Sequence, residues 1–121
     1  MKKVKAIVLP CIVLMLAMFT QTVQAQETTA ELKIKTSAVC DMCKETIEKY
    51  MAFEKGVKKS SLDVDSKILT VTYNPQKTSP EKIRNAVSKS GYDADHVLAD
   101  AKAYKKLDAC CKKGAVCNDK K

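Results

Sequence analysis

Strand-like and helix-like segments follow one another along this chain in an order that few folds allow. Four segments have the alternating or β-branched pattern that is typical of strands: Glu31–Thr36, Val57–Val64, Ile68–Tyr73 and Tyr92–Leu98. Asp65-Ser66 separates the second segment from the third and is typical of a turn, which predicts that these two strands pair as a hairpin.

Two helices are predicted between these strands. Cys43–Phe53 places most of its apolar side chains near one face, and Gly56 follows as a stop signal. The second helix begins with Ser79 as its cap and Pro80 at its first position, and it ends near Gly91. Strand, helix, strand, strand, helix, strand is the order of the α+β ferredoxin-like sandwich, a four-stranded antiparallel sheet with two helices on one face.

Residues 1–25 have the three-part layout of a secretory signal peptide. Met1–Lys5 is basic, Ala6–Phe19 carries no charge, and Val23 and Ala25 are small residues that suit cleavage after Ala25. The uncharged run is shorter than the roughly 20 residues that cross a bilayer. We therefore expect cleavage near Ala25 and export to the periplasm or the medium, which are oxidising compartments.

Residues 99–121 form a tail rich in Cys and Lys. Ala99–Leu107 predicts a short helix, and we expect Asp108–Lys121 to be mobile unless a metal ion or a disulfide holds it. The net charge of +8 is concentrated at the two ends of the chain. Because the middle is nearly neutral, the composition does not describe a nucleic-acid-binding surface.

The CxxC motif, Cys40-Asp41-Met42-Cys43, lies between a predicted strand and a predicted helix. Two intervening residues let both sulfurs turn toward one point, and the backbone N–H groups and dipole of a helix start favour thiolate over thiol. Two converging thiolates are soft ligands that suit Cu(I), Hg(II) or Zn(II). An accessible pair would pass its ion to a partner's thiol by ligand exchange, without catalysis.

The chain resembles the heavy-metal-associated domain family over about residues 31–98. The CxxC motif, the hairpin that follows it and Gly91-Tyr92-Asp93-Ala94 carry this resemblance. The family includes copper chaperones, the metal-binding domains of P-type ATPases and periplasmic mercury-binding proteins. This chain has Ser37-Ala38 where the family pattern has Gly-Met.

The resemblance implies a metal-binding domain over residues 26–98 that holds a soft ion through Cys40 and Cys43. It implies a membrane metal transporter or P-type ATPase as the partner that receives the ion. It also assigns Tyr92 a packing role beside the metal-binding loop. The predicted export makes the periplasmic mercury-binding type the nearest analogue.

Cys110, Cys111 and Cys117 admit two interpretations. One is a disulfide between Cys117 and one of the two adjacent cysteines, formed in an oxidising compartment. The other is a second soft-metal site, or a third ligand that reaches the CxxC motif. The neighbouring Lys112 and Lys113 should lower the pKa of these thiols.

Three other residues could ligate an ion, but each has a more ordinary interpretation. Asp41 could give an oxygen to Zn(II), yet acidic residues are common at helix starts. Met42 could add a soft sulfur but is expected to be an exposed loop residue. His96 could act as a ligand only if the fourth strand brought it to the CxxC motif.

Three classes of function remain after these arguments. The sequence contains no Ser/His/Asp set, no phosphate-binding loop and no carboxylate pair beside a histidine, so we do not expect an enzyme. We expect a metal-binding protein, and we expect it to be a monomer. The CxxC motif also permits a periplasmic thiol–disulfide redox protein, although a thioredoxin-like fold needs a longer chain after the motif. The third class is a ferredoxin-like interaction domain with structural disulfides.

Overall fold

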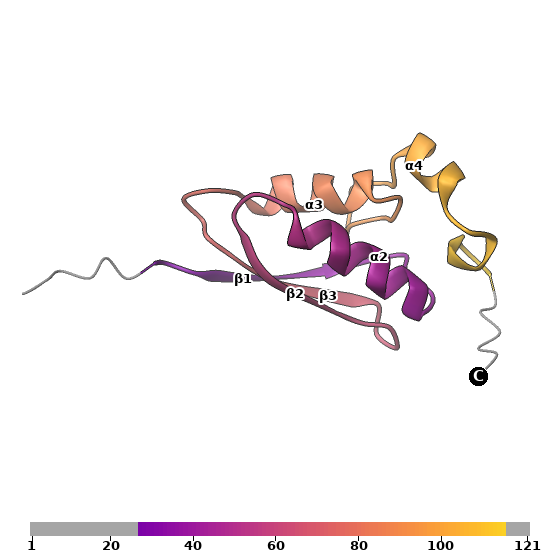
Figure 1. Cartoon of the computed structure of the whole chain (residues 1–121), viewed down its shortest axis with the longest axis horizontal. Coiled ribbons are helices and arrows are strands. Elements are labelled where there is room, and N and C mark those ends of the chain that lie inside the picture. Colours follow the sequence, from indigo (N-terminus) through magenta and orange to yellow (C-terminus); the bar gives the residue numbers. More distant parts are fainter. Residues whose placement is uncertain (1–26, 116–121) are drawn as a thin grey trace, which may run out of the picture.

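A three-stranded antiparallel sheet forms one layer of the protein, and two helices cover one of its faces (Figure 1). The computed structural model describes residues 27–115. The sheet has the order β1-β3-β2, with these bounds: β1 Ala30–Lys35, β2 Val57–Asp63 and β3 Ile68–Tyr73. The two covering helices are α2, Asp41–Ala52, and α3, Pro80–Lys89.

The alternation of the strands decides which face of the sheet is covered. Leu69 and Val71 of the central strand β3 are fully buried, and Leu69 pairs with Ile34 of β1 and with Leu62 of β2. Since successive strand residues point to opposite faces, these apolar side chains all face the helices. The expected hairpin of β2 and β3 is confirmed by their antiparallel register.

Helix α2 presents Cys43, Ile47 and Met51 to the sheet at intervals of four residues, and all three are fully buried. The helix begins at Asp41, earlier than expected, because Cys40 acts as its N-cap residue in an extended conformation (φ −156°, ψ 175°). The backbone N–H of Lys44 donates to the Cys40 carbonyl over 3.1 Å, which closes the first turn.

Helix α3 begins as its sequence predicts. The Ser79 hydroxyl accepts a hydrogen bond from the backbone N–H of Lys82 over 3.4 Å, and Pro80 is the first helical residue. Ile83, Ala86 and Val87 form its buried face. Its other boundary, near Gly91, is also confirmed.

The fourth strand expected at Tyr92–Leu98 is wrong. This segment contributes only two isolated bridges, between Thr36 and Ala94 and between Ala94 and Val97. Asp95 has a positive φ of 52°, so the chain turns back on itself instead of extending along β1. Asp95 also accepts a hydrogen bond from the Lys35 backbone N–H over 2.8 Å, so the turn is fastened at the end of β1.

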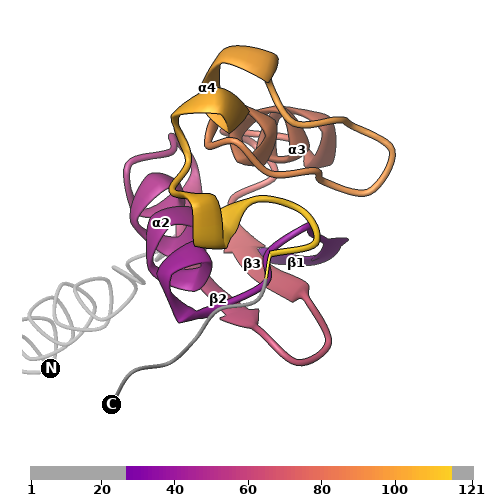
Figure 2. The same cartoon turned by 90° about the vertical axis from the view of Figure 1, so that its right-hand side faces the viewer.

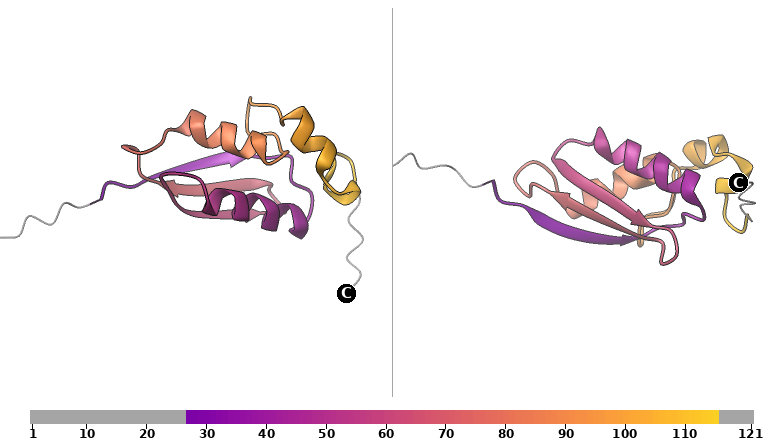
Figure 3. Two further views of the ribbon diagram at one scale, coloured as in Figure 1. Left: turned by 45° about the horizontal axis from the view of Figure 1, so that its top comes forward. Right: turned by 60° about the horizontal axis from the view of Figure 1, so that its bottom comes forward.

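The C-terminal part of the chain turns back toward the start of α2. Helix α4 spans Ala101–Lys106 and is followed by a short 3₁₀ helix, η1, at Ala109–Cys111. Figure 2 shows η1 in yellow beside α2, and both views in Figure 3 place it at the same end of the sheet. Cys111 is part of the buried core, and Leu107 and Cys110 pack against that core. The described part of the tail therefore contacts the domain, although Asp108–Lys121 was expected to be mobile without a metal ion or a disulfide.

Two sequence predictions fall outside the described residues: the signal peptide at residues 1–25 and the role of Cys117. Within residues 27–115, no helix combines the length and apolarity that a bilayer crossing requires.

Candidate metal centre

The start of α2 brings the two cysteines of the CxxC motif into contact. The Sγ atoms of Cys40 and Cys43 lie 3.4 Å apart, well beyond the roughly 2.05 Å of a disulfide bond. Cys40 occupies the cap position and Cys43 the first turn, so one turn of helix sets the separation of their sulfurs. The motif therefore supplies two convergent sulfur ligands.

The loop that leads to the motif is held by small side chains. The Thr36 hydroxyl donates to the carbonyl of Lys67 over 3.0 Å. The Ser37 hydroxyl accepts a hydrogen bond from the backbone N–H of Asp93 over 2.9 Å. Ala38, which stands where the family pattern has Met, is fully buried. These contacts fix the path of the chain into Cys40.

The CxxC motif is covered, which corrects the expectation of an accessible pair. Cys40 is 6% exposed and Cys43 is 0% exposed. The covering segment is η1: the Cys40 thiol points at the Cys110 carbonyl oxygen over 4.0 Å. The Cys110 thiol in turn lies 3.7 Å from the Met42 sulfur. The C-terminal segment thus contacts two residues of the motif.

The covering segment brings two more thiols to the site. The sulfurs of Cys40, Cys110 and Cys111 all lie within 4.8 Å of one another, and those of Cys110 and Cys111 are 3.9 Å apart. Cys43 adjoins this group through its contact with Cys40. The structure therefore brings together four of the five predicted ligands, and the fifth, Cys117, lies outside the described residues.

Tyr92 lies beneath the sulfur cluster and is fully buried. Burial, followed by the neighbouring thiols of Cys43 and Cys111, raises the pKa of its hydroxyl. No atom among the described residues meets the geometry of a hydrogen bond to this hydroxyl. Tyr92 therefore stays protonated and presents a donor to the cluster, beyond the packing role that the sequence suggested.

Burial also raises the pKa of the Cys111 thiol, and the adjacent Cys43 adds to this effect. For Cys111, this result contradicts the expectation that Lys112 and Lys113 lower the thiol pKa. The Lys113 ammonium pairs instead with a carboxylate oxygen of Asp93, 2.6 Å away. Binding of an ion at Cys111 would therefore release a proton.

The remaining candidates lie at the edge of the site or away from it. His96 pairs with Glu81 over 3.4 Å and is exposed, so it is not part of the sulfur cluster. Asp41 is an exposed acidic residue in the first turn of α2. Met42 is half exposed and contributes its sulfur next to Cys110.

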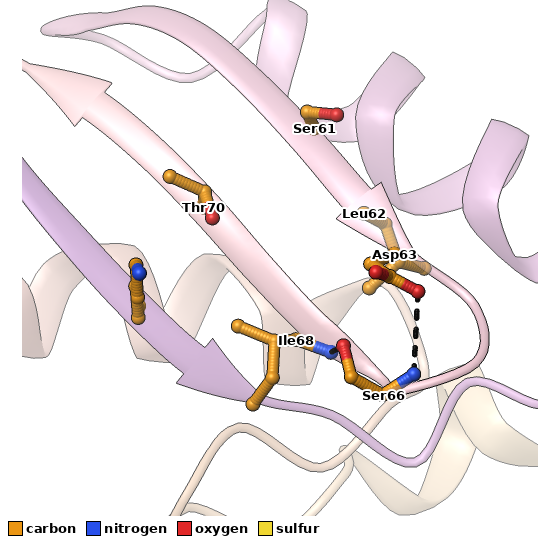
Figure 4. Close-up of a pocket in the computed structure, with 7 residues that line it drawn as sticks. Ser61, Leu62, Asp63, Ser66, Ile68 and Thr70 are labelled. Carbon is orange, nitrogen blue, oxygen red and sulfur yellow. Dashed lines mark hydrogen bonds between the residues drawn. The ribbon is translucent and has the colours of Figure 1, made fainter.

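A hollow of about 490 Å³ lies on the uncovered face of the sheet (Figure 4). Residues of all three strands and of the β2–β3 turn line it: Lys33, Ser61, Leu62, Asp63, Ser66, Ile68 and Thr70. No cysteine is among them, so the hollow is separate from the sulfur cluster.

Comparison with known proteins places this geometry in a family. Residues 34–93 match the heavy-metal-associated domain. The chain is 32% identical over 54 residues to the copper chaperone CopZ of Staphylococcus haemolyticus, a match that covers 45% of this chain and 79% of CopZ. It is 32% identical over 71 residues to copper-transporting ATPase 1 of Rattus norvegicus, which covers 58% of this chain and 5% of the ATPase.

A solved structure of another protein has a similar fold. The crystal structure of oxidized MerP from Ralstonia metallidurans CH34 aligns with a TM-score of 0.54 at 25% identity, covering 56% of this chain and 96% of MerP. The chain belongs to the heavy-metal-associated domain family, and its predicted ferredoxin-like fold class is confirmed. It spans only 5% and 10% of the length of two copper-transporting ATPases that it matches.

Proposed function

We propose that this protein is an exported, non-catalytic carrier of a soft metal ion, Cu(I) or Hg(II), which it binds through Cys40 and Cys43. It sequesters the ion or delivers it to a membrane transporter such as a P-type ATPase. The observation that carries the proposal is the 3.4 Å contact between the two sulfurs at the start of α2. Thiolates held this close favour soft ions over hard ones.

The relatives support the choice of ion. CopZ is a copper chaperone, which supports Cu(I). MerP, which shares this fold, is also known in a mercury-bound form, which supports Hg(II). Zn(II) is the third candidate, because four cysteine sulfurs near one another resemble the ligand set of structural zinc sites. Among the described residues, the neighbourhood of the cluster offers no histidine, since His96 pairs with Glu81.

Transfer of the ion proceeds by ligand exchange. A thiol of the partner loses its proton and binds the ion while both cysteines of the CxxC motif still hold it. One of these cysteines then leaves and takes up a proton, and the other leaves in the same way when a second thiol of the partner binds. The number of metal–sulfur bonds never falls to zero, so the ion is not released to solvent. Because the motif is covered by η1, this exchange requires the C-terminal segment to move aside.

A titration of the reduced protein with Cu(I) and with Hg(II) under anaerobic conditions tests the proposal. We expect the wild type to bind one equivalent tightly and the Cys40→Ser/Cys43→Ser variant to lose that site while its circular dichroism is unchanged. Asp41→Asn is the matched control, because it alters the same motif but removes no sulfur. A double variant that binds as tightly as wild type would overturn the proposal.

The redox alternative gives a different result in the same experiment. A wild type that binds no ion but cycles between dithiol and disulfide near the roughly −270 mV of thioredoxin would be a redox protein. Export is tested separately, by sequencing the N-terminus of the protein from a periplasmic fraction. We expect cleavage after Ala25, and an intact N-terminus in the cytosol contradicts export.

A further inference from the structure

We propose that Cys110 and Cys111 complete the metal site, so that the ion is held by at least three thiolates beneath η1 instead of by the CxxC motif alone. This inference rests on the proposed function, because it takes Cys40 as a ligand. It adds a closed state to that function: the C-terminal segment is a lid that contributes ligands of its own.

The sulfur separations fit a site with three or four ligands. With metal–sulfur bonds of about 2.3 Å, sulfurs lie about 3.8 Å apart around a tetrahedral ion, about 4.0 Å apart around a trigonal ion and about 4.6 Å apart across a linear one. The Cys40 and Cys43 sulfurs are 3.4 Å apart and those of Cys110 and Cys111 are 3.9 Å apart. Both values are nearer to the tetrahedral and trigonal separations than to the linear one.

The third separation needed is also present. Cys40 lies within 4.8 Å of both Cys110 and Cys111, which come from a segment about seventy residues later in the chain. Cys110 and Cys111 are far from Cys40 and Cys43 in the sequence, so local spacing does not explain why their thiols meet. The fold brings the two pairs together as one ligand cluster. The Cys110 and Cys111 sulfurs therefore face the start of α2, where Cys111 is buried and Cys110 contacts Met42.

The lid is attached by specific contacts on its own side. The backbone N–H of Lys113 donates to the Tyr104 hydroxyl over 3.1 Å, and the Lys113 ammonium pairs with Asp93 over 2.6 Å. Leu107 packs against the core and lies against Gly91. These contacts hold η1 at both ends and leave its two thiols facing the CxxC motif.

A buried donor is available for the charge that such a site would carry. Three thiolates around Cu(I) or a divalent ion leave a net negative charge, which is costly in a buried position unless polar groups compensate for it. The Tyr92 hydroxyl is fully buried, lies beside Cys43 and Cys111, and has no hydrogen-bond partner among the described residues. A thiolate at either position would accept a hydrogen bond from it.

X-ray absorption spectroscopy of the reduced protein loaded with one equivalent of Cu(I), and separately of Cd(II), counts the sulfur ligands directly. We expect three or four sulfurs in the wild type and two in Cys110→Ser/Cys111→Ser. Ala109→Ser is the matched control, because it changes the neighbouring exposed residue of η1 and removes no thiol. We expect it to keep the wild-type count.

The rate at which a chelator removes the ion provides a second measurement. Loss of the lid ligands should speed removal by on the order of tenfold or more, since even partners outside the ligand set change metal affinity by about 10–100-fold. Cys110→Ser alone, at the more exposed position, repeats the test with the least risk to folding. Thermal melts check that each variant stays folded.

The two proposals fail in different ways. Two sulfurs in the wild type, with unchanged removal rates in the lid variants, would overturn the closed site and leave the CxxC carrier intact. A wild type that binds none of Cu(I), Hg(II) and Cd(II) overturns both. Three or more sulfurs that persist in Cys110→Ser/Cys111→Ser also overturn the lid, because the additional ligands then come from elsewhere.

Discussion

The two pairs of cysteines are held in place by different kinds of structure. Cys40 caps α2 and Cys43 lies in its first turn, and the backbone hydrogen bonds and buried face of this helix fix their sulfurs. Cys110 and Cys111 belong to a three-residue 3₁₀ helix that a few side-chain contacts hold against the domain. Segments with few backbone hydrogen bonds open at lower free energy than helices packed in a core.

This difference assigns the two pairs different roles in binding. The first pair is a fixed ligand set that is present whenever the domain is folded. The second pair is a removable set whose position depends on the contacts of the tail. An ion would therefore be retained when the tail is docked and become exchangeable when it opens.

The largest effect is expected from exchanging thiols in one pair or the other. Cys40→Ser/Cys43→Ser should abolish tight binding of Cu(I), because the fixed set is lost and only the weakly held pair remains. Cys110→Ser/Cys111→Ser should weaken binding by roughly 10–100-fold and keep the stoichiometry. Competition with a Cu(I) chelator measures both. Equal losses of Cu(I) affinity in the two variants would contradict the proposed difference between a fixed and a removable ligand pair.

A backbone change at Gly91 should undock the tail. Gly91 has a φ of +104°, and a Cβ atom there would lie 3.1 Å from the Leu107 side chain. Gly91→Ala should therefore strain the turn and push Leu107 away, which exposes the CxxC motif. We expect faster reaction of Cys40 and Cys43 with a thiol reagent, read by mass spectrometry of the labelled peptides.

Gly56→Ala is the control for Gly91→Ala. Gly56 also has a positive φ, +83°, and a Cβ atom there would lie 2.9 Å from Thr78, away from the cysteines. It should cost stability by a comparable amount, about 1–2 kcal/mol for the left-handed conformation, without faster labelling of the motif. Faster labelling in both variants would indicate general loosening and not undocking.

Removal of the buried Tyr92 hydroxyl should lower the affinity for Cu(I) without lowering the stability of the metal-free protein. Tyr92→Phe deletes a group that has no hydrogen-bond partner among the described residues, so the melting temperature of the metal-free protein should stay the same or rise slightly. Chelator competition should show a loss of Cu(I) affinity of a few-fold, about 1 kcal/mol for one hydrogen bond. Tyr73→Phe, at a buried position of β3, is the control and should leave affinity unchanged. Unchanged Cu(I) affinity in Tyr92→Phe would show that the hydroxyl does not contribute to ion binding.

The smallest effect concerns the ion pair that fastens the tail. Burial by itself raises the pKa of Asp93, but the hydrogen bonds from Lys113 and from the Ala99 backbone N–H outweigh it and hold the pKa below its usual value. A carboxyl group with a lowered pKa stabilises the folded state above its unfolded pKa, and this contribution disappears as the pH falls through the folded value. Docking of the tail should therefore weaken only in acid, below about pH 4.

Asp93→Asn should reproduce the acid effect at neutral pH. It removes the charge that Lys113 contacts and keeps an oxygen that can accept from Ala99. Hydrogen exchange of the metal-free protein should show faster exchange in residues 108–115 and little change in α2. Asp65→Asn, in the β2–β3 turn, serves as the control. Equal exchange rates in Asp93→Asn and wild type would show that the ion pair does not hold the tail.

Local patterns predicted most of the fold. The alternation of Ile68–Tyr73 and the Ser79-Pro80 helix start appear in the structure as predicted, because each depends on neighbours in the sequence. The fourth strand did not form, because the positive φ of Asp95 and its hydrogen bond to β1 turn the chain away. No periodicity in Tyr92–Leu98 indicates that turn.

The candidate site divides in the same way. The CxxC spacing was sufficient to predict that the sulfurs of Cys40 and Cys43 converge, since one turn of helix sets their separation. The burial of the motif, the fastening role of Asp93 and the contact of Met42 with Cys110 were missed. The available signal was the short helix predicted at Ala99–Leu107, in which Tyr104 and Leu107 are spaced for one face.

The amino-acid sequence by itself determined the strands, the helices and a pair of soft ligands at the start of α2, because hydrophobic periodicity, capping and ligand spacing act over a few residues. Only the tertiary structure decided that Cys110 and Cys111 meet that pair and close over it. Their approach depends on contacts between distant segments, such as Lys113 with Asp93 and Leu107 with Gly91. Such contacts form only after the sheet and helices have brought these residues to the same end of the domain.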